Sequence, residues 1–282
     1  MHREDIIRYY NETRLDYRWF WFRKNSNRPM HFGYFDPQIK GHWDSLEQLN
    51  KVMAAKVGIG PGDVILDAGC GQGGSALWLA SDFEDVQVEG ITLVPHQVNI
   101  ARKAAKKRGL TNARFTIGDY CSMDYPDGYF SVIWACESLC HASVKLDFYK
   151  EAFRVLRPGG RLIIADGIRA ERALSVEEAT LFHEWLAGWC CPGLDSWEEH
   201  HKNIIDVGFS RLHMEDITPF VTPSMQRLAT ISRRILPLGK FLKMLKLRSA
   251  IRHRNLLSAI QQYEALQKGL WTYGLLFAIK PQ

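Results

Sequence analysis

An apolar run that leads straight into a glycine-rich turn constrains the fold more than any other feature of this sequence. Residues 64–66 are Val-Ile-Leu, Asp67 follows them, and the next seven residues contain four glycines, namely Gly69, Gly71, Gly73 and Gly74. Glycine lets the backbone turn tightly with a positive φ and lets a ligand approach the main chain without meeting a Cβ atom. The pattern therefore predicts a strand, a ligand-binding turn and a helix, in that order.

Short β-branched or apolar runs alternate with helical segments after this turn, which is typical of a parallel sheet covered on both faces. We expect strands at 64–66, 86–92, 113–117, 130–136, 161–165, 211–217 and 271–279. Helices are expected at 73–81, 95–108 and 146–155, where they supply the crossovers that parallel strands need. The sequence thus predicts an α/β protein with a doubly wound, seven-stranded, mostly parallel sheet.

The rest of the chain surrounds this sheet. A length of 282 residues with 46% hydrophobic side chains can bury one large core and still leave an accessory cap. We expect an aromatic-rich helical cap at 1–60, a core at 61–217, a basic helical insertion or lid at 218–266 and a final core strand at 267–282.

Two further features bear on where the protein works. The first residues mix charges of both signs, unlike a secretory signal, and no later stretch approaches the roughly 20 apolar residues of a membrane span. We therefore expect a cytoplasmic protein, with contact to a membrane surface left open. The six cysteines show no Cys-x-x-Cys spacing, so we expect buried thiols and no protein-bound metal.

Three features bear on which ligand the turn binds, since the glycine spacing alone also fits a dinucleotide. Asp67 precedes the first glycine, where a carboxylate can take an ammonium group but would repel a pyrophosphate. Asp119, followed by Tyr120, comes after the third strand, where an acid can accept a hydrogen bond from the amine of adenine. A Pro-Gly-Gly turn at 158–160 joins a helix to the fifth strand.

Together, these features resemble the class I S-adenosylmethionine-dependent methyltransferases, over residues 60 to 170. The resemblance implies a Rossmann-like sheet and a cofactor site that includes Asp67, Gly69, Gly71, Gly73, Asp119 and Tyr120. The family usually carries an acid at the end of the second strand, where this sequence has Thr92. The Gly-Ile-Thr-Leu segment at 90–93 is similar to the tocopherol, sterol and cyclopropane-synthase branch, which implies cofactor contacts for Thr92, Leu93 and Gln97.

The segment that follows the fourth strand is expected at the mouth of the sheet, where open α/β sheets bind ligands. Its Glu-Ser-Leu-Cys-His-Ala sequence at 137–142 resembles that of sterol and other terpenoid C-methyltransferases, in which the glutamate is thought to face the substrate. When an alkene carbon attacks a methyl group, a carbocation develops that a carboxylate and aromatic faces can stabilise. Glu137 fits the anion, and His141 can remove a proton near neutral pH. A structural or capping role is the alternative for both.

Aromatic side chains are abundant enough to line a pocket around such an acceptor. We expect acceptor contacts for Tyr17, Trp19 and Phe22 in the cap and for Trp185 and Trp189 after the fifth strand, with plain core packing as the alternative for each. The segment at 30–37 resembles an aromatic loop that closes over the cofactor in the same branch, which implies a cofactor contact for Tyr34.

Residues 233–254 contain eight basic side chains interleaved with apolar ones, and no acid interrupts them. Three interpretations stay open: a solvated helix face, contact with an anionic membrane surface, or recognition of an anionic acceptor such as a prenyl diphosphate. Mg²⁺ is expected only with a diphosphate acceptor. We expect no nucleic-acid partner, because the aromatic residues are not interleaved with the basic ones. A homo-oligomer stays open.

The sequence therefore predicts a methyltransferase that acts on an alkene carbon of an isoprenoid, either a prenyl diphosphate or a sterol-like side chain. Ring closure through the carbocation is a further option. The alternative enzyme is an N- or O-methyltransferase of an alkaloid, quinol or tocopherol-like ring. The alternative from another class is a cofactor-binding scaffold without turnover.

Overall fold

Seven strands form one sheet in the order β3-β2-β1-β4-β5-β7-β6. The computed structural model describes residues 3–20 and 29–282, without the side chains of residues 18–20. The strands are β1 (Val64–Ala68), β2 (Gln87–Thr92), β3 (Ala113–Ile117), β4 (Phe130–Cys136), β5 (Leu156–Arg169), β6 (Ser210–Asp216) and β7 (Trp271–Ile279). Strands β1 to β5 pair in parallel and β7 is antiparallel to both of its neighbours, so the predicted doubly wound, mostly parallel sheet is confirmed.

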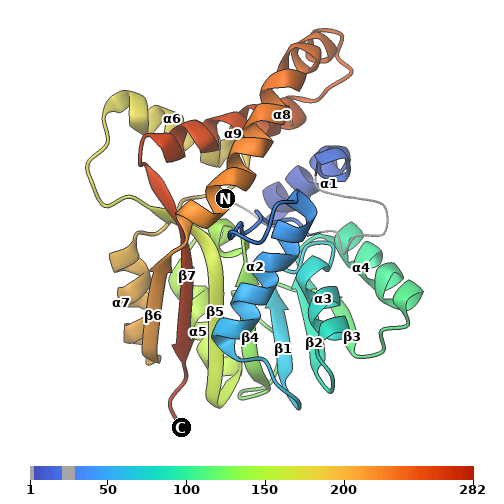
Figure 1. The fold of residues 1–282 in the computed structure, drawn as a ribbon, viewed down its shortest axis with the longest axis vertical. Coiled ribbons are helices and arrows are strands. Elements are labelled where there is room, and N and C mark those ends of the chain that lie inside the picture. Colours follow the sequence, from blue (N-terminus) through green and yellow to red (C-terminus); the bar gives the residue numbers. More distant parts are fainter. Residues whose placement is uncertain (1–2, 21–28) are drawn as a thin grey trace.

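Helices cover both faces of this sheet (Figure 1). One face packs against α2 (His42–Val57), α3 (Gly74–Asp82) and α4 (Pro95–Arg108). The other face packs against α5 (Lys145–Val155) and α7 (Trp197–Val207). Because each face is covered, the central strands are buried along most of their length, which explains why their sequences are continuous apolar runs.

The fifth strand is longer than its sequence predicts. Residues 156–169 are extended, because β7 pairs along the whole segment from Arg161 to Arg169. The Pro-Gly-Gly segment at 158–160 lies inside this strand as a bulge: β4 pairs with Leu156 and resumes at Arg161. The predicted Pro-Gly-Gly turn thus falls within β5, where Gly159 has φ +73° and the pairing with β4 is interrupted.

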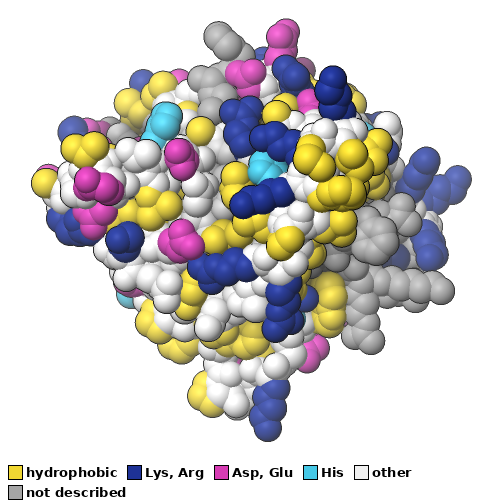
Figure 2. All heavy atoms as spheres, turned by 90° about the horizontal axis from the view of Figure 1, so that it is seen from above, with side chains coloured by type: hydrophobic (Ala, Val, Ile, Leu, Met, Phe, Trp, Pro, Cys, Tyr) yellow, Lys and Arg dark blue, Asp and Glu magenta, His cyan; other side chains and the backbone are white. Residues whose placement is uncertain are grey.

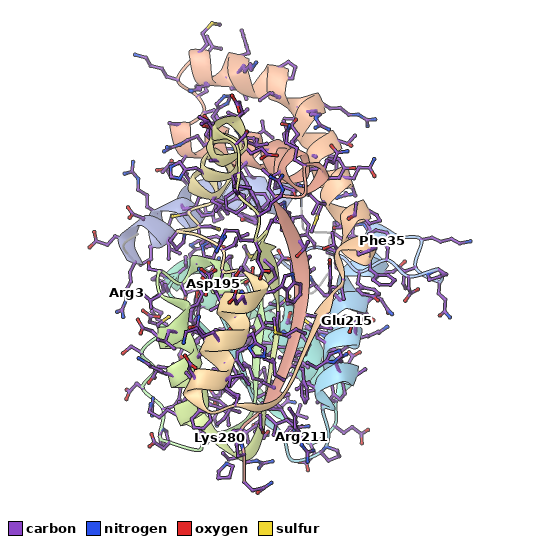
Figure 3. The ribbon with its side chains drawn as sticks, turned by 90° about the vertical axis from the view of Figure 1, so that its left-hand side faces the viewer. Arg3, Phe35, Asp195, Arg211, Glu215 and Lys280 are labelled. Carbon is purple, nitrogen blue, oxygen red and sulfur yellow. The ribbon has the colours of Figure 1, made fainter. Side chains whose placement is uncertain are left out.

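A second layer of helices lies at the end of the sheet where the parallel strands finish (Figures 1 and 3). It contains α1 (Arg3–Phe20), α6 (Val176–Gly188), α8 (Thr218–Met244) and α9 (Ala250–Gln267). In Figure 3, Arg3 and Phe35 lie where this layer meets the sheet, on opposite sides of the molecule. Lys280 and Arg211 lie at the other end of the sheet. Among the helices that the structure describes, none is both long and apolar enough to cross a membrane.

The helical layer supplies acidic partners to part of the basic segment at 233–254. Three of the eight basic residues of 233–254 form ion pairs with acids that are distant in the sequence. Arg248 and Arg252 both pair with Asp16 of α1, at 2.9 and 2.8 Å, and Arg233 pairs with Glu264 of α9 at 3.0 Å. Arg248 and Asp16 are almost fully buried, so this pair fixes α1 against the hairpin formed by α8 and α9.

Candidate active site

The glycine turn after β1 is fixed by the neighbouring strand. The amides of Gly69 and Cys70 both donate to the carbonyl oxygen of Ile91, at 3.0 and 2.9 Å. Gly69 has φ +87° and Gly71 has φ +52°, and a Cβ on Gly69 would lie 2.4 Å from the Cβ of Ser138. The turn therefore presents bare main chain to the space in front of the sheet, and a larger residue at position 69 cannot fit.

A cleft opens in front of this turn. Its lining contains most of the residues that the sequence assigns to the cofactor: Gly69, Gly71, Thr92, Leu93, Gln97, Asp119 and Tyr120. Thr92 and Gln97 lie side by side, since the Thr92 hydroxyl donates to the Gln97 carbonyl oxygen at 2.7 Å. That bond occupies the Gln97 oxygen, so its NH₂ group is the part that can donate to a ligand hydroxyl.

Asp119 and Tyr120 are held by bonds that leave them at the edge of the cleft. Asp119 accepts from the Cys121 amide at 2.8 Å and pairs with Arg3 of α1 at 2.7 Å. The Tyr120 hydroxyl donates to the Ser138 carbonyl at 2.6 Å. An adenine amine would therefore compete with the exposed Arg3 side chain for the Asp119 carboxylate.

Asp67 and Gly73 lie beneath the turn, outside the described lining of the cleft. Asp67 is buried and accepts from the Ala76 amide at 3.1 Å, which holds the first turn of α3, and burial raises its pKa to about 7. A contact with a ligand ammonium would have to use its other oxygen, Oδ1. A Cβ on Gly73 would meet the Ala101 Cβ at 2.9 Å, so this glycine permits close packing against α4 and does not face the ligand space.

Tyr34 also lies elsewhere than the resemblance implies. Its ring stacks on Phe220 at the start of α8, with centroids 4.7 Å apart and planes 10° apart, outside the described lining of either cavity. Met30 and Phe32 of the same loop do reach the site. The Met30 sulfur lies near Gly71, and both residues line the second cavity described next. The loop thus approaches the ligand space through its first residues, because its middle packs against α8.

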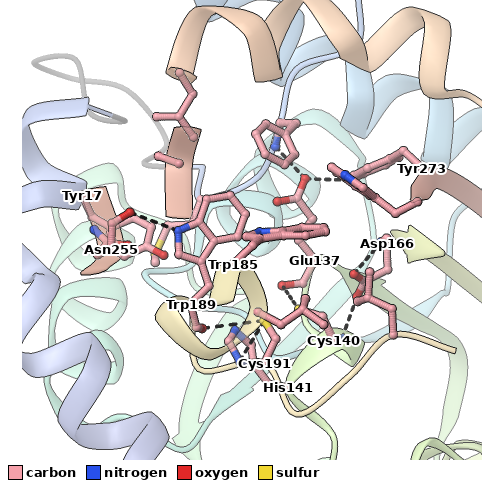
Figure 4. Close-up of a pocket in the computed structure, with 18 of the residues that line it drawn as sticks. Tyr17, Glu137, Cys140, His141, Asp166, Trp185, Trp189, Cys191, Asn255 and Tyr273 are labelled. Carbon is pink, nitrogen blue, oxygen red and sulfur yellow. Dashed lines mark hydrogen bonds between the residues drawn. The ribbon is translucent and has the colours of Figure 1, made fainter. Parts of the chain in front are cut away.

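A second cavity adjoins the cleft beneath the helical layer (Figure 4). The two cavities share Tyr10, Glu137 and His141 in their linings. Tyr17, Trp185 and Trp189 line the second cavity, which we call the acceptor cavity. Trp185 contacts both Trp189 and Trp271 ring to ring. Of the other aromatic residues expected here, Phe22 and the side chain of Trp19 lie outside the described residues.

Glu137 stands at the boundary between the two cavities in a conformation that L-residues rarely adopt. Its φ is +49°, and its amide donates to the Ala165 carbonyl at 2.8 Å. One carboxylate oxygen, Oε1, accepts from the Phe32 amide at 2.6 Å and from the Tyr273 hydroxyl at 2.7 Å. Burial raises the pKa of Glu137 to about 8, although both hydrogen bonds act to lower it. Such a strained, poised carboxyl group in a cavity is typical of a functional site.

His141 lies beside Glu137, with both ring nitrogens engaged. Its Nε2 lies 2.8 Å from the Tyr10 hydroxyl and its Nδ1 lies 3.0 Å from the Cys190 carbonyl. Burial acts to lower the pKa of His141, but Cys191 and the Cys190 carbonyl outweigh it and raise the pKa. The ligand atoms of Cys140, His141 and Cys191 lie within 4.8 Å of one another, so this group offers the donors that a soft divalent metal would use.

Comparison with known proteins identifies the family. A family model described as a methyltransferase domain matches residues 65–160. The chain is 31% identical to 27-O-demethylrifamycin SV methyltransferase of Amycolatopsis mediterranei over 202 residues, which is 71% of this chain and 73% of that protein. The chain is a class I S-adenosylmethionine-dependent methyltransferase. It is also 31% identical to 24-methylenesterol C-methyltransferase 2 of Oryza sativa subsp. japonica over 74% of this chain, but the match spans only 56% of that longer protein.

Solved structures share the fold of this methyltransferase along its whole length. The cyclopropane synthase MmaA2 of Mycobacterium tuberculosis aligns with a TM-score of 0.85 over 99% of both chains, at 17% identity. Geranyl diphosphate C-methyltransferase of Streptomyces coelicolor aligns with a TM-score of 0.72 over 99% of this chain and 97% of that one, at 20% identity. At these identities the likeness concerns the fold, including the helical layer over the sheet.

Sequence reasoning missed the part of α1 that covers the cleft of the methyltransferase. Arg3, Ile6 and Tyr10 line it, and Tyr10 lines the acceptor cavity as well. Their spacing of three and four residues is the sequence signal that was available, because it places them on one face of a helix. That spacing predicts a shared face but does not tell what the face covers.

Proposed function

We propose that this methyltransferase transfers a methyl group from S-adenosylmethionine to an alkene carbon of an isoprenoid. The observation that carries the proposal is the place of Glu137, on the wall shared by the cofactor cleft and an acceptor cavity rich in aromatic rings. The cofactor supplies an electrophilic methyl group on a positively charged sulfur. The chain's task is to orient the acceptor and to stabilise positive charge on it.

Residues of the cleft fit the parts of this cofactor. The bare main chain at Gly69 and Gly71 gives room for close approach, and Thr92 and Gln97 offer polar groups where the family usually has an acid. Asp119 suits the adenine amine once Arg3 moves aside. These assignments rest on position and on chemical type.

Glu137 can supply the negative charge when it is needed. With a pKa of about 8 its carboxyl group is mostly neutral at pH 7 in the empty cavity. A positive charge nearby lowers the pKa of a carboxyl group, and the donors from Phe32 and Tyr273 already favour the ionised form. Glu137 therefore ionises as positive charge arrives, and the rings of Tyr17, Trp185 and Trp189 add their electron-rich faces.

His141 can accept the proton that ends the reaction. Its Nδ1–H donates to the Cys190 carbonyl in the neutral tautomer, which leaves Nε2 to accept from Tyr10. A proton lost from the carbon beside the cation passes to the Tyr10 oxygen, while the Tyr10 hydroxyl proton passes to Nε2. The carbon–hydrogen electron pair forms the new double bond, so the charges balance.

The names of relatives support an acceptor of this class. The chain resembles a sterol C-methyltransferase in sequence and a geranyl diphosphate C-methyltransferase in fold. The match spans little more than half of the sterol enzyme, so the main support for this acceptor class is the lining of the cavity.

The test is incubation with methyl-labelled cofactor and a panel of prenyl alcohols, prenyl diphosphates, a sterol, phenols and amines, read by mass spectrometry of the products. We expect a new carbon–carbon bond on an isoprenoid. Glu137→Gln should lower that rate about 1000-fold, because it removes the stabilising charge, and should leave affinity for S-adenosylhomocysteine within about threefold. Turnover of a phenol or amine that survives Glu137→Gln would instead support N- or O-methylation. Tight cofactor binding without any product would support a scaffold.

A further inference from the structure

We infer that the acceptor is an uncharged isoprenoid that carries a hydroxyl or carbonyl oxygen, and not a diphosphate. The inference rests on the proposed function and narrows its substrate class. It comes from the charges and from the unpartnered polar groups in the wall of the acceptor cavity.

The described wall of the acceptor cavity offers a diphosphate no lysine or arginine side chain. Asp16, Glu137 and Asp166 line it, and the described lining contains neither lysine nor arginine. Diphosphates are bound by arginine forks, lysines or Mg²⁺, since burying several negative charges without counter-charges is very costly. A neutral molecule avoids that cost.

Two arginines of the described helical layer and two carboxylates of the described wall are already engaged in hydrogen bonds. Arg248 and Arg252 both bind Asp16, and Asn255 also donates to it at 3.3 Å. Asp166 accepts from the amides of Cys140 and Gly167, at 3.0 and 2.7 Å. Within the part of the chain that the structure describes, these arginines and carboxylates are therefore not free to bind a phosphate or the Mg²⁺ that a diphosphate brings.

Two buried polar groups in the same wall have no partner. Trp185 Nε1 and Ser232 Oγ form no hydrogen bond with any described atom, and the side chains are 3% and 1% exposed. Both residues line the acceptor cavity. Burying a donor without a hydrogen-bond acceptor costs free energy. A ligand whose oxygen accepts from that donor recovers this free energy on binding. A neutral indole N–H and a hydroxyl suit a neutral oxygen.

The test compares matched acceptors that differ only in the polar end: a prenyl alcohol, its diphosphate, and the hydrocarbon that lacks the oxygen. We expect kcat/KM for the alcohol to exceed that for the diphosphate, with no effect of a chelator. Trp185→Phe and Ser232→Ala should each lower kcat/KM for the alcohol about fivefold to tenfold more than they lower kcat/KM for the hydrocarbon.

Two controls match these variants. Trp189 lines the same cavity, but its Nε1 donates to the Asn255 carbonyl, so Trp189→Phe should affect alcohol and hydrocarbon alike. Ser258 has an unpartnered buried hydroxyl outside the described lining, so Ser258→Ala should leave both unchanged. Preference for the diphosphate would overturn the inference while the proposed function stands. Failure of every isoprenoid would overturn the proposed function itself.

A separate observation concerns residues 238–247, which we call the hairpin tip, where α8 passes to α9. Five large apolar side chains of this segment are each at least 48% exposed: Leu238, Phe241, Met244, Leu245 and Leu247. Lys240, Lys243 and Lys246 are exposed among them, and the sequence has no acid from 217 to 263. Figure 2 looks onto this end of the molecule and shows basic side chains beside apolar ones.

The geometry points to an anionic membrane surface as the partner of the hairpin tip. Exposed apolar side chains enter the headgroup region of a bilayer, and lysines beside them bind lipid phosphates. A second copy of this chain fits less well, because it would bring lysine against lysine. The same two helices supply Leu228, Ser232, Leu256 and Ala259 to the acceptor cavity, so the tip would bring that cavity next to a lipid phase.

The test is sedimentation with vesicles made from equal amounts of phosphatidylcholine and phosphatidylserine, without acceptor, so that it is independent of turnover. We expect binding that weakens with salt, and Lys240→Gln with Lys243→Gln should weaken it about fivefold per lysine. Phe241→Ser with Leu245→Ser should abolish it. Lys103→Gln with Lys106→Gln on α4, and Ile205→Ser on α7, are exposed controls that should bind like the parent.

Binding that the tip variants leave unchanged, or the absence of binding to these vesicles, would overturn this second inference. So would a dimer in solution, measured by light scattering, that the Phe241→Ser and Leu245→Ser changes dissociate. That result would assign the hairpin tip to contact between copies of the chain.

Discussion

The cofactor cleft and the acceptor cavity meet at Glu137 but are built in different ways. Most of the cleft comes from the segments that follow β1, β2, β3 and β4, all within residues 69–147, which are little more than one quarter of the sequence. The acceptor cavity takes its wall from α1, the segment before α2, the segment after β4, β5, α6 and the segment after it, α8, α9 and β7. The first is shaped by backbone geometry, and the second by how distant helices pack.

This difference predicts which kind of substitution should disrupt each cavity. The cleft depends on main-chain conformation, so it is vulnerable to a single added Cβ atom. The acceptor cavity depends on contacts between segments, such as the Asp16 ion pairs and the Lys145 amino group, which donates to the carbonyls of Ala142 and Gly193 and ties two loops together. Damage there should affect stability and acceptor binding before it affects the cofactor.

The largest effect is expected from Gly69→Val, which should weaken cofactor binding about 100-fold or more, because a β-branched residue is strained at φ +87° and collides with Ser138. Calorimetric titration with S-adenosylhomocysteine measures it. Gly60→Ala is the control, since a Cβ there meets nothing within 4 Å. Unchanged affinity in Gly69→Val would show that the ligand does not lie against this turn.

Asp16→Asn should destabilise the protein by about 3 kcal/mol, because it leaves the buried Arg248 without its counter-charge. Denaturant unfolding measures the change, and acceptor affinity should fall more than cofactor affinity. Glu47→Gln is the control: its pair with Lys51 on α2 is exposed and should be worth less than about 0.5 kcal/mol. Equal loss in both variants would mean that the ion pairs of Asp16 do not hold α1 in place.

The same difference explains what the sequence could and could not predict. The strands and the positions of Gly69, Thr92 and Asp119 were predictable, because the ends of parallel strands converge on one edge. The partnership of Arg248 with Asp16 was not, since 232 residues separate them and only packing brings them together. Tyr34 shows a third case, in which the motif gives the right loop, but Phe32 lines the acceptor cavity while Tyr34 stacks on Phe220.

The pKa of Glu137 gives a prediction for the boundary between the cavities. Its carboxyl group is mostly protonated below pH 8, and the positive sulfur of S-adenosylmethionine stabilises the ionised form. Affinity for S-adenosylmethionine should therefore rise with pH and level off above about 8. A pKa lowered by one unit in the complex would give about a tenfold change. S-Adenosylhomocysteine, whose sulfur is neutral, should show no such rise, and neither should Glu137→Gln with either ligand.

Tyr273→Phe should move that pH dependence by about one unit to higher pH, because it removes one of the two donors to Oε1 and so raises the pKa of Glu137 further. Titration of cofactor affinity against pH measures the midpoint. Tyr149→Phe is the control, since its hydroxyl contacts His200 on the other face of the sheet. A midpoint that does not move would show that the Tyr273 bond does not act on the ionised carboxylate.

The smallest effect is expected from Tyr34→Ala. Comparing it with Met30→Ala distinguishes the role of the middle of the loop at 30–37 from that of its first residue. Because the ring stacks on Phe220 and not on the cofactor cleft, the change should cost about 1 kcal/mol of stability and alter cofactor affinity less than about twofold. Met30→Ala should alter cofactor affinity more, since its sulfur lies close to Gly71. A tenfold loss of cofactor affinity in Tyr34→Ala would mean that the loop rearranges when the cofactor binds, so that the cleft, too, depends on packing with α8.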